Sequence, residues 1–361
     1  METLVPPALA ASAPERARAV QALLDAHGPE MDRRRELTPE VVEALAGQDL
    51  LRMLLPKSMG GQETPLVEYC KACEAIAWAD ASSAWFVNQS NVSAASSAAA
   101  MPHEAAAAIF AGPRAGLAWG ARHNNSTAIR VEGGYRLTGT WSFASGGRHT
   151  KWLGAHSAVQ NADGTPLIRY GRPDDRSFLF LREQATIIDD WHVLGLRGTG
   201  SDSYSVKDLF VPDAHAPARD VPDERREKGP IYPIGSTLLY ASGFCSVTLG
   251  LGRRMLETLT ELARGKHSRS APTVMARNNS VQREVGLLEA KLSAARAFLH
   301  EAAGQVYDAS AAGTAAISEK APFERRFRDA MSASQHLQGM LPHVEMVGRH
   351  IIGTENVVQF V

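Results

Sequence analysis

Apolar residues recur at two different spacings along the chain, and the spacing changes twice. From residue 14 to about 111 they stand three and four positions apart, as in Val41, Val42 and Leu45, which is the period of an amphipathic helix. From about 116 to 212 the apolar runs are short, partly alternating and rich in β-branched and aromatic residues, and Gly, Asn and Asp separate them. Helical spacing then returns, in 256–264, 282–305, 323–338 and 344–352.

This order of helix, sheet and helix predicts an α+β fold with four parts. They are a helical N-terminal domain (1–115), a central β-barrel or sandwich domain (116–215), a connection (216–235) and a C-terminal bundle of the four-helix type (236–361). Proline and charged residues are frequent around the proposed connection, which favours a connecting segment there. A chain of 361 residues is long enough for such a division.

Composition excludes several classes of function. The net charge is -1 and the basic residues are dispersed, so nucleic-acid binding is not expected. No apolar run approaches the roughly 18 to 20 residues of a membrane span, and the N-terminus has no basic stretch followed by an apolar one, so we expect a cytoplasmic protein without a membrane partner. Cys70 and Cys73 fall within a continuous helical pattern, where buried small hydrophobic side chains are the simpler interpretation than redox or zinc chemistry.

Two glycine-rich segments, 139–147 (GTWSFASGG) and 195–202 (GLRGTGSD), stand inside the β-region. A phosphate-binding glycine loop closes a strand and opens a helix, so that backbone N–H groups face the phosphates. Here strand-like segments follow instead, in 150–159 and 204–212. The sequence therefore carries no nicotinamide-binding fingerprint, and these glycines mark turns of a β-domain.

In this order and spacing the two segments resemble the middle domain of the acyl-CoA dehydrogenase superfamily. Their amino-acid residues resemble those of its branch of two-component flavin-dependent monooxygenases. Further matches run through nearly the whole chain, in 55–61 (LPKSMGG), 82–85 (SSAW), 133–139 (GGYRLTG) and 322–330 (PFERRFRDA). The resemblance implies a homotetrameric oxygenase subunit. It would take reduced flavin (FADH2 or FMNH2) from a separate NAD(P)H:flavin reductase and use O2 to hydroxylate a small aromatic, for example indolic, substrate through a C4a-hydroperoxyflavin.

The resemblance places the first catalytic candidate at His336. Dehydrogenase relatives commonly carry a glutamate base eight residues after the Asp of an Arg-Asp-Ala motif, but eight residues after Asp329 this chain has Leu337, which cannot take a proton. His336, beside it, matches a histidine that monooxygenase relatives place near the flavin, where an imidazole can donate or accept a proton near neutral pH. The alternative is that His336 packs in a helix face, since His343 and His350 follow it at intervals of seven residues. Pro342 interrupts that series, so no metal site is expected.

The resemblance also implies a set of flavin contacts. Ser145 would reach the N5 edge of the flavin, where a hydroxyl can hold back the N5 proton, and the alternative is a turn serine before two glycines. Trp141 and Phe143 would pack near the isoalloxazine, or else simply fill the core. Arg269 would supply a cation to the flavin phosphate of a neighbouring subunit.

Substrate contacts are expected on two segments. Phenol-hydroxylating relatives often carry a histidine eight residues after Trp85, where this chain has Ser93. With Asn88 and Asn91 close by, neutral hydrogen bonding to the substrate is one interpretation, and capping or packing of helices is the other. His123 stands in a loop that often faces substrate or flavin, and its neighbour Arg122 would suit a carboxylate; simple solvation of an exposed loop is the alternative.

Other functions remain open at the level of sequence. They are an acyl-CoA dehydrogenase or oxidase, an N-hydroxylating, nitroso-forming monooxygenase of an amino sugar, and a bundle that has lost flavin and serves as a scaffold for partners. Tight oxidised flavin that bleaches anaerobically with an acyl-CoA would indicate the first. Failure to bind flavin at all would indicate the last.

Overall fold

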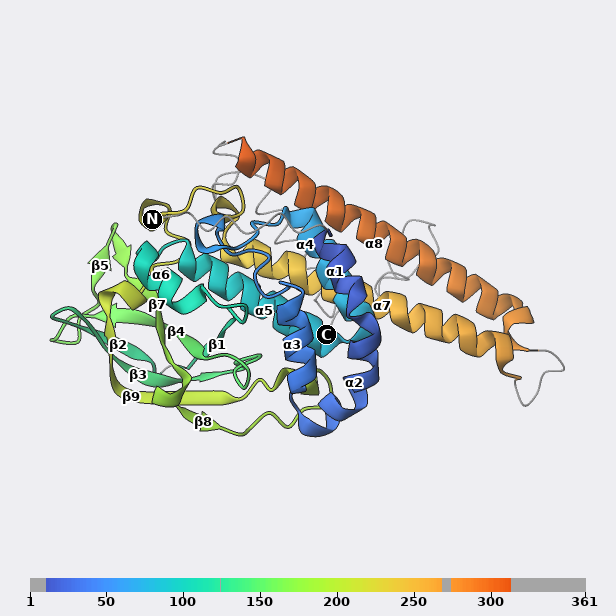
Figure 1. The fold of residues 1–361 in the computed structure, drawn as a ribbon, viewed down its shortest axis with the longest axis horizontal. Helices are drawn as coiled ribbons and strands as arrows, with labels where there is room; N and C mark the ends of the chain where they lie inside the picture. Colours follow the sequence, from blue (N-terminus) through green and yellow to red (C-terminus); the bar gives the residue numbers. More distant parts are fainter. Residues whose placement is uncertain (1–10, 124, 268–273, 313–361) are drawn as a thin grey trace, which may run out of the picture.

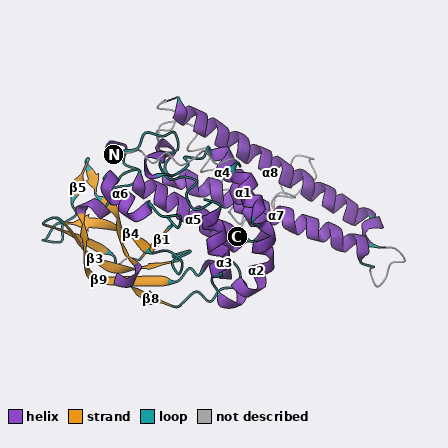
Figure 2. Cartoon of the chain, in the orientation of Figure 1, coloured by secondary structure: helices purple, strands orange, loops and turns teal. Residues whose placement is uncertain are grey.

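The computed structural model describes residues 11–123, 125–267 and 274–312. They form a group of packed helices, a β-region confined to one end of the molecule, and two long helices that run out at the other end (Figures 1 and 2). Along the chain the order is helix, sheet, helix. The α+β class predicted from the apolar spacing is confirmed, and the predicted helices 323–338 and 344–352 lie outside the described residues.

Side-chain caps mark the start of two of the described N-terminal helices. Ser12 and Glu15 form a capping box at the start of the first helix, with a Ser12 Oγ to Glu15 Oε2 distance of 2.7 Å. Asp80 caps the fifth helix and accepts the Ser83 N–H at 2.6 Å, while the third helix has Pro39 in its first turn. The helices are α1 (Ala13–Ala19), α2 (Gln21–Arg34), α3 (Pro39–Gly47), α4 (Leu66–Ala79), α5 (Ala81–Ala98) and α6 (His103–Phe110).

Helix α4 contains both cysteines of the C-x-x-C spacing. Cys70 and Cys73 are fully buried and free, and they belong to the main helical core. Burial raises the pKa of the Cys70 thiol to about 12, so it stays protonated and unreactive at neutral pH. The interpretation of these residues as buried small hydrophobic side chains is confirmed.

The β-region is a seven-stranded sheet whose pairings close into a ring. Strand β1 pairs with β4, β4 with β2, β2 with β3, and β3 again with β1, which gives the region a barrel-like shape; β9 and β8 extend it beyond β3, and β7 pairs with β4. Trp141, Tyr204 and Phe178 fill the interior. The strands are β1 (Leu117–Arg122), β2 (Thr127–Val131), β3 (Gly134–Ser142), β4 (Trp152–Gln160), β7 (Asp175–Leu181), β8 (Thr186–Ile188) and β9 (Ser203–Pro212), with a small separate pair β5 (Ile168–Arg169) and β6 (Arg172–Pro173).

After the sheet, short 3-10 turns occupy the connecting segment and lead into two long helices, α7 (Ser236–Gly265) and α8 (Asn279–Ala311). Helix α7 begins well before the amphipathic segment 256–264 that predicted it. Its first part packs against both α4 and α5 and is buried on several sides, so no polar stripe marks it in the sequence.

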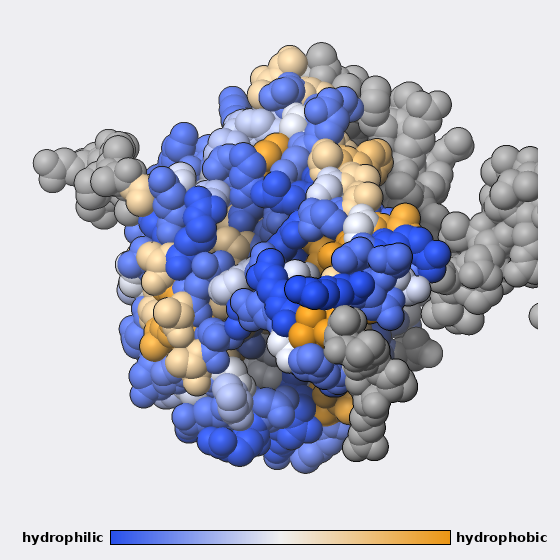
Figure 3. Space-filling model, turned by 90° about the vertical axis from the view of Figure 1, so that its right-hand side faces the viewer, coloured by the Kyte–Doolittle hydropathy of each residue, from blue (hydrophilic) through white to orange (hydrophobic). Residues whose placement is uncertain are grey.

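The face toward the α7 and α8 end carries patches of hydrophobic surface among polar side chains (Figure 3). Exposed apolar residues of these two helices are Leu251, Met255, Leu262, Leu287, Leu288 and Phe298. Helices of a bundle normally bury such side chains against further helices. The remainder of the predicted bundle, 313–361, falls outside the described residues.

Gly250 allows the closest approach of α7 to α4. A Cβ at this position would overlap the carbonyl oxygen of Glu74 and would come within 2.8 Å of the Ala77 Cβ. We expect Gly250→Ala to lower the free energy of unfolding by about 2 to 3 kcal/mol, because backbone atoms cannot yield as a flexible side chain can. Gly286→Ala on the exposed face of α8 is the control, since no described atom lies within 4 Å of its added methyl. That variant should gain about 0.5 to 1 kcal/mol. Urea denaturation compares the two, and equal stability of Gly250→Ala and wild type would contradict this account of the packing.

Candidate active site

The two glycine-rich segments of the sequence meet in space. The Gly146 N–H donates to the Thr199 carbonyl at 2.8 Å, and the Ala144 N–H donates to the Asp202 carbonyl at 3.1 Å. Arg148 completes the contact with two hydrogen bonds to the Asp202 carboxylate, of 2.6 and 2.8 Å. Segments that stand about fifty residues apart in the chain therefore form one junction at the end of the β-region nearest the helices.

Ser145 lies at the centre of this junction, in a chain of hydroxyl groups. Its Oγ accepts from the Trp85 indole N–H of α5 at 3.2 Å and lies 2.8 Å from Ser201 Oγ. Ser201 Oγ lies 2.6 Å from Thr199 Oγ1, which donates to the Leu196 carbonyl at 2.8 Å. The last step fixes the direction of the others: Ser201 donates to Thr199, and Ser145 donates to Ser201.

This direction determines what Ser145 can still bind. A hydroxyl has one proton and two acceptor positions. The proton goes to Ser201 and one acceptor position takes the Trp85 N–H, so one acceptor position remains. Ser145 is thus prepared to receive an N–H from a ligand and has no proton to give it.

Phe143 leaves the β3 strand with a left-handed backbone, at φ 64°. Its side chain is 62% exposed and meets the Trp191 ring edge to face, with 6.1 Å between the ring centres. Trp141, two residues earlier, is fully buried; its indole N–H donates to the His156 carbonyl at 2.9 Å and its ring stacks on Tyr204. Core burial therefore describes Trp141. For Phe143 the structure leaves an exposed aromatic surface next to the junction, which suits contact with a flat ring system.

A row of aromatic rings extends from the junction across the interface of α5, α7 and β1. Trp85 stacks on Phe244 with 3.9 Å between the ring centres, and Phe244 stacks on Tyr240 at 5.8 Å. Tyr240 and Trp119 are 6.1 Å apart. No sequence motif marks Phe244, Tyr240 or Trp119 as site residues, because these rings come together only through the packing of three distant segments.

The predicted substrate residues of α5 are fully buried. Asn91 accepts the Leu54 N–H at 3.1 Å and donates to the carbonyls of Leu50 and Val87 at 2.8 and 2.9 Å. Asn88 accepts from the Tyr69 hydroxyl at 2.7 Å and donates to the Tyr240 carbonyl at 3.2 Å.

Ser93 donates to the backbone of its own helix and lies 2.6 Å from the Leu117 carbonyl of β1. These contacts, like those of Asn88 and Asn91, satisfy the side chain within the protein. They favour the packing alternative over substrate contact for all three residues.

His123 remains exposed, and its Nε2 lies 2.6 Å from Ser142 Oγ. Arg122, beside it, is paired with Asp175 at 3.1 Å and is not free to receive a carboxylate. The other predicted site residues, His336 and Arg269, lie outside the described residues. Ser145 and Phe143 are therefore brought to one junction, whereas Trp141 and the predicted α5 residues serve the interior.

His149 supports the same junction and gives it a pH dependence. Its Nε2 accepts the Leu37 N–H at 3.1 Å, and burial lowers the pKa of its imidazole from 6.5 to about 4. The unfolded chain binds this proton near pH 6.5 and the folded protein only near pH 4, so stability falls as the pH drops through this window. The loss amounts to at most about 3 kcal/mol. We expect His149→Gln, which keeps an acceptor but has no titrating ring, to reduce the difference in unfolding free energy between pH 6.5 and 4.5. An identical pH dependence in variant and wild type would contradict this.

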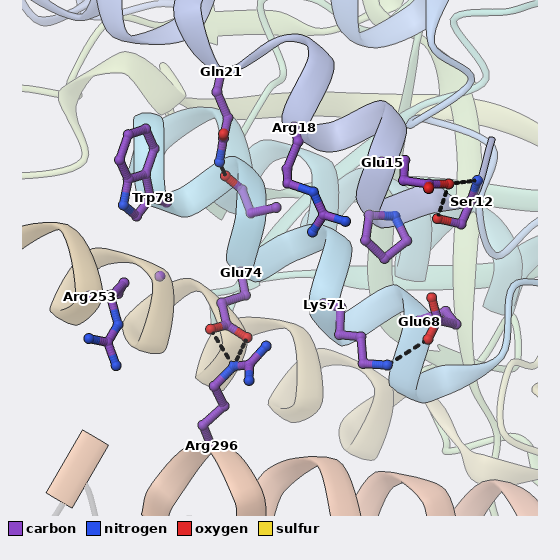
Figure 4. Close-up of a pocket in the computed structure, with 13 residues that line it drawn as sticks. Ser12, Glu15, Arg18, Gln21, Glu68, Lys71, Glu74, Trp78, Arg253 and Arg296 are labelled. Atoms are coloured by element: carbon purple, nitrogen blue, oxygen red, sulfur yellow. Dashed lines mark hydrogen bonds and ion pairs between the residues drawn. The ribbon is translucent and has the colours of Figure 1, made fainter. Parts of the chain in front are cut away.

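A hollow of about 320 Å³ lies elsewhere, between α1, α4, α7 and α8. Figure 4 shows charged side chains around it, several of them paired: Glu74 with Arg296, and Glu68 with Lys71 at 2.8 Å. Its size does not make it the active site, because it shares no residue with the junction or with the row of rings. Within the described ranges, no three metal-ligating side chains gather, and no helix combines the length and hydrophobicity of a bilayer crossing.

Comparison with known proteins shows the family of this chain. Residues 14–105 match the acyl-CoA dehydrogenase N-terminal domain, and 242–312 match the acyl-CoA dehydrogenase C-terminal domain. The chain is 30% identical over 321 residues to an indole-3-acetate monooxygenase of Pseudomonas putida, covering 87% of this chain and 79% of the relative. It is 28% identical over 314 residues to the flavin-dependent monooxygenase oxygenase subunit HsaA of Rhodococcus jostii, covering 81% and 75%.

The fold has a similar counterpart among solved structures. XiaF from Streptomyces sp., in complex with FADH2 and glycerol, superposes with a TM-score of 0.75 at 24% identity, covering 97% of both chains. The chain thus belongs to the acyl-CoA dehydrogenase superfamily and, within it, to the flavin-dependent monooxygenase oxygenase subunits. It is an oxidoreductase of that class.

Proposed function

We propose that this protein is the oxygenase component of a two-component system that hydroxylates a small aromatic compound. It would receive FADH2 or FMNH2 from a separate NAD(P)H:flavin reductase and use O2 as co-substrate, as a homotetramer. The observation that carries the proposal is the hydroxyl chain through Ser145, which leaves a single acceptor position for an N–H. Reduced flavin carries such an N–H at N5, whereas oxidised flavin offers only an acceptor there. The junction therefore suits the reduced cofactor.

When bound, the flavin would supply an oxygen-transferring C4a-hydroperoxide. The residues of this chain have separate tasks around it. Ser145 would accept a hydrogen bond from the N–H at flavin N5 and so keep that proton on N5, since its loss would release H2O2. Trp85 and the hydroxyls of Ser201 and Thr199 keep Ser145 in its accepting orientation. Phe143 would contact the flavin ring system.

The row of rings favours an aromatic substrate over an amino sugar. Stacked and edge-on aromatic side chains recognise flat apolar rings, while a sugar needs converging hydrogen-bond groups. The relatives named for indole-3-acetate support an indolic compound. His336 as proton donor and Arg269 as phosphate contact remain part of the proposal, carried by the family resemblance.

Rapid mixing of the protein and reduced flavin with oxygenated buffer tests the function. We expect an oxygenated flavin species with its own absorbance, which persists without substrate and yields hydroxylated product with one. Direct oxidation to flavin and H2O2, with no such species, would argue against an oxygenase. Anaerobic bleaching of bound oxidised flavin by an acyl-CoA would instead indicate the dehydrogenase alternative.

A further inference from the structure

Arg219 lies at the far end of the row of rings, in the segment between the sheet and α7. Its guanidinium carbon lies 4.5 Å from the centre of the Trp119 ring, and its Nη1 donates to Ser236 Oγ at 3.0 Å. Among the described residues no carboxylate oxygen lies within 4.0 Å of it. The charge is therefore held in place by a ring and a hydroxyl and is not neutralised by a direct ion pair.

Neighbouring carboxylates of the described residues form no direct ion pair with it. Asp175 interacts with the charge of Arg219 but is bound to Arg122 at 3.1 Å. Asp220 is engaged by Ser236, whose N–H and hydroxyl both donate to it, at 2.8 and 2.5 Å. Asp175 and Asp220 therefore both bond to other groups, and the Arg219 guanidinium keeps donors that no carboxylate of the described residues occupies.

His156 contacts the same indole ring edge to face, with 4.4 Å between the ring centres. Its Nδ1 lies 2.9 Å from Ser177 Oγ, whereas its buried Nε2 has no hydrogen-bond partner among the described residues. Burial and the charges of Arg219 and Arg122 lower the pKa of this imidazole well below its usual range, so it is neutral. The bond to Ser177 leaves Nε2 available to a ligand, and binding of a carboxylate there requires that Ser177 donate to Nδ1 and that the ring proton lie on Nε2.

An unpaired polar atom in the interior costs free energy unless a ligand satisfies it. Here a cation without a carboxylate partner and a buried ring nitrogen without a hydrogen-bond partner, among the described residues, contact the same ring. We propose that Arg219 and His156 form a subsite for a carboxylate, and that the substrate is therefore an aromatic acid whose ring lies along Trp119 and Tyr240. The inference rests on the proposed function for the reaction itself. The planar guanidinium fits the two oxygens of a carboxylate.

The test compares an acid with its neutral amide, using indole-3-acetate and indole-3-acetamide as probes and titration calorimetry on the full-length protein. We expect wild type to bind the acid at least tenfold more tightly than the amide. Arg219→Gln should remove this preference, and Arg219→Lys should restore part of it. Arg136→Gln, which removes an exposed charge of the sheet that pairs with Asp208, is the control and should keep the wild-type ratio.

Equal affinity of wild type for acid and amide, absence of binding of both, or a preserved preference in a folded Arg219→Gln would overturn the carboxylate subsite. His156→Phe, which keeps a ring against Trp119 and removes the donor, gives a second measurement and should lower affinity for the acid alone. Rapid mixing of the same proteins with reduced flavin and oxygen separates the two levels of the proposal. If the wild-type protein forms the oxygenated flavin but does not distinguish acid from amide, the proposed function stands and the carboxylate subsite is overturned.

Discussion

Replacing Ser145 with alanine should shorten the life of the oxygenated flavin species, in the absence of substrate, by at least roughly tenfold. That factor corresponds to about 1.4 kcal/mol of the barrier to its decay. In the proposed function, Ser145 would offer its one remaining acceptor position to the N–H at flavin N5, because its own proton is donated to Ser201. Without this acceptor, the N5 proton would leave more readily and H2O2 would be released. Stopped-flow absorbance after mixing reduced flavin, protein and oxygen measures the decay.

Two further variants show whether the hydroxyl chain, and not the loss of any hydroxyl, is responsible. Ser96→Ala on α5 removes a partly buried hydroxyl that donates only within its own helix, and it should decay like wild type. Ser201→Ala should shorten the lifetime less than Ser145→Ala, because Ser145 would stay in place but lose the partner that fixes its proton. A Ser145→Ala decay rate equal to that of wild type would make Ser145 a turn residue only.

The two glycine-rich segments stand out in the sequence more clearly than the residues around them. The order and spacing of 139–147 and 195–202 carry the family resemblance, and the structure adds that their backbones hydrogen-bond to each other. Strand alternation predicts that Trp141 and Phe143, which are two residues apart, point to the same face, and both are large aromatic residues. The sequence therefore cannot tell which of the two is buried. They differ because the backbone of Phe143 turns to φ 64° after β3 ends at Ser142, which places one ring in the core and the other at the surface.

No local sequence pattern predicts the row of rings or the position of Arg219 beside it. Trp85 and Phe244 stack directly although they belong to helices that are far apart in the chain. Arg219 stands in a charged, proline-rich segment for which the sequence predicts a connection, and only its position over Trp119 distinguishes it from a solvated arginine. Contacts of this kind depend on how helices pack on the sheet, and hydrophobic periodicity does not report that packing.

Polar residues on α5 show the opposite limit of sequence reasoning. Asn88, Asn91 and Ser93 look like a substrate-binding cluster because polar side chains are rare in a buried helix. The structure gives each of them partners inside the protein: a tyrosine hydroxyl for Asn88 and backbone groups for the other two. A buried polar side chain that tethers neighbouring segments has the same sequence signature as one that binds a ligand, so only the hydrogen bonds separate the two.

We therefore expect Asn91→Leu to lower the free energy of unfolding by about 3 to 5 kcal/mol and to leave the ranking of substrates unchanged. The variant would leave the buried Leu54 N–H and Leu50 carbonyl without partners, at about 1 to 3 kcal/mol for each group, and would add a branched side chain to a fully buried position. Asn125→Leu, at an exposed loop position, is the matched control and should change stability by less than about 0.5 kcal/mol. Urea denaturation measures the first effect, and product formation from a panel of indoles and phenols measures the second. A stable Asn91→Leu protein whose substrate ranking changes by tenfold or more would return this residue to the substrate site.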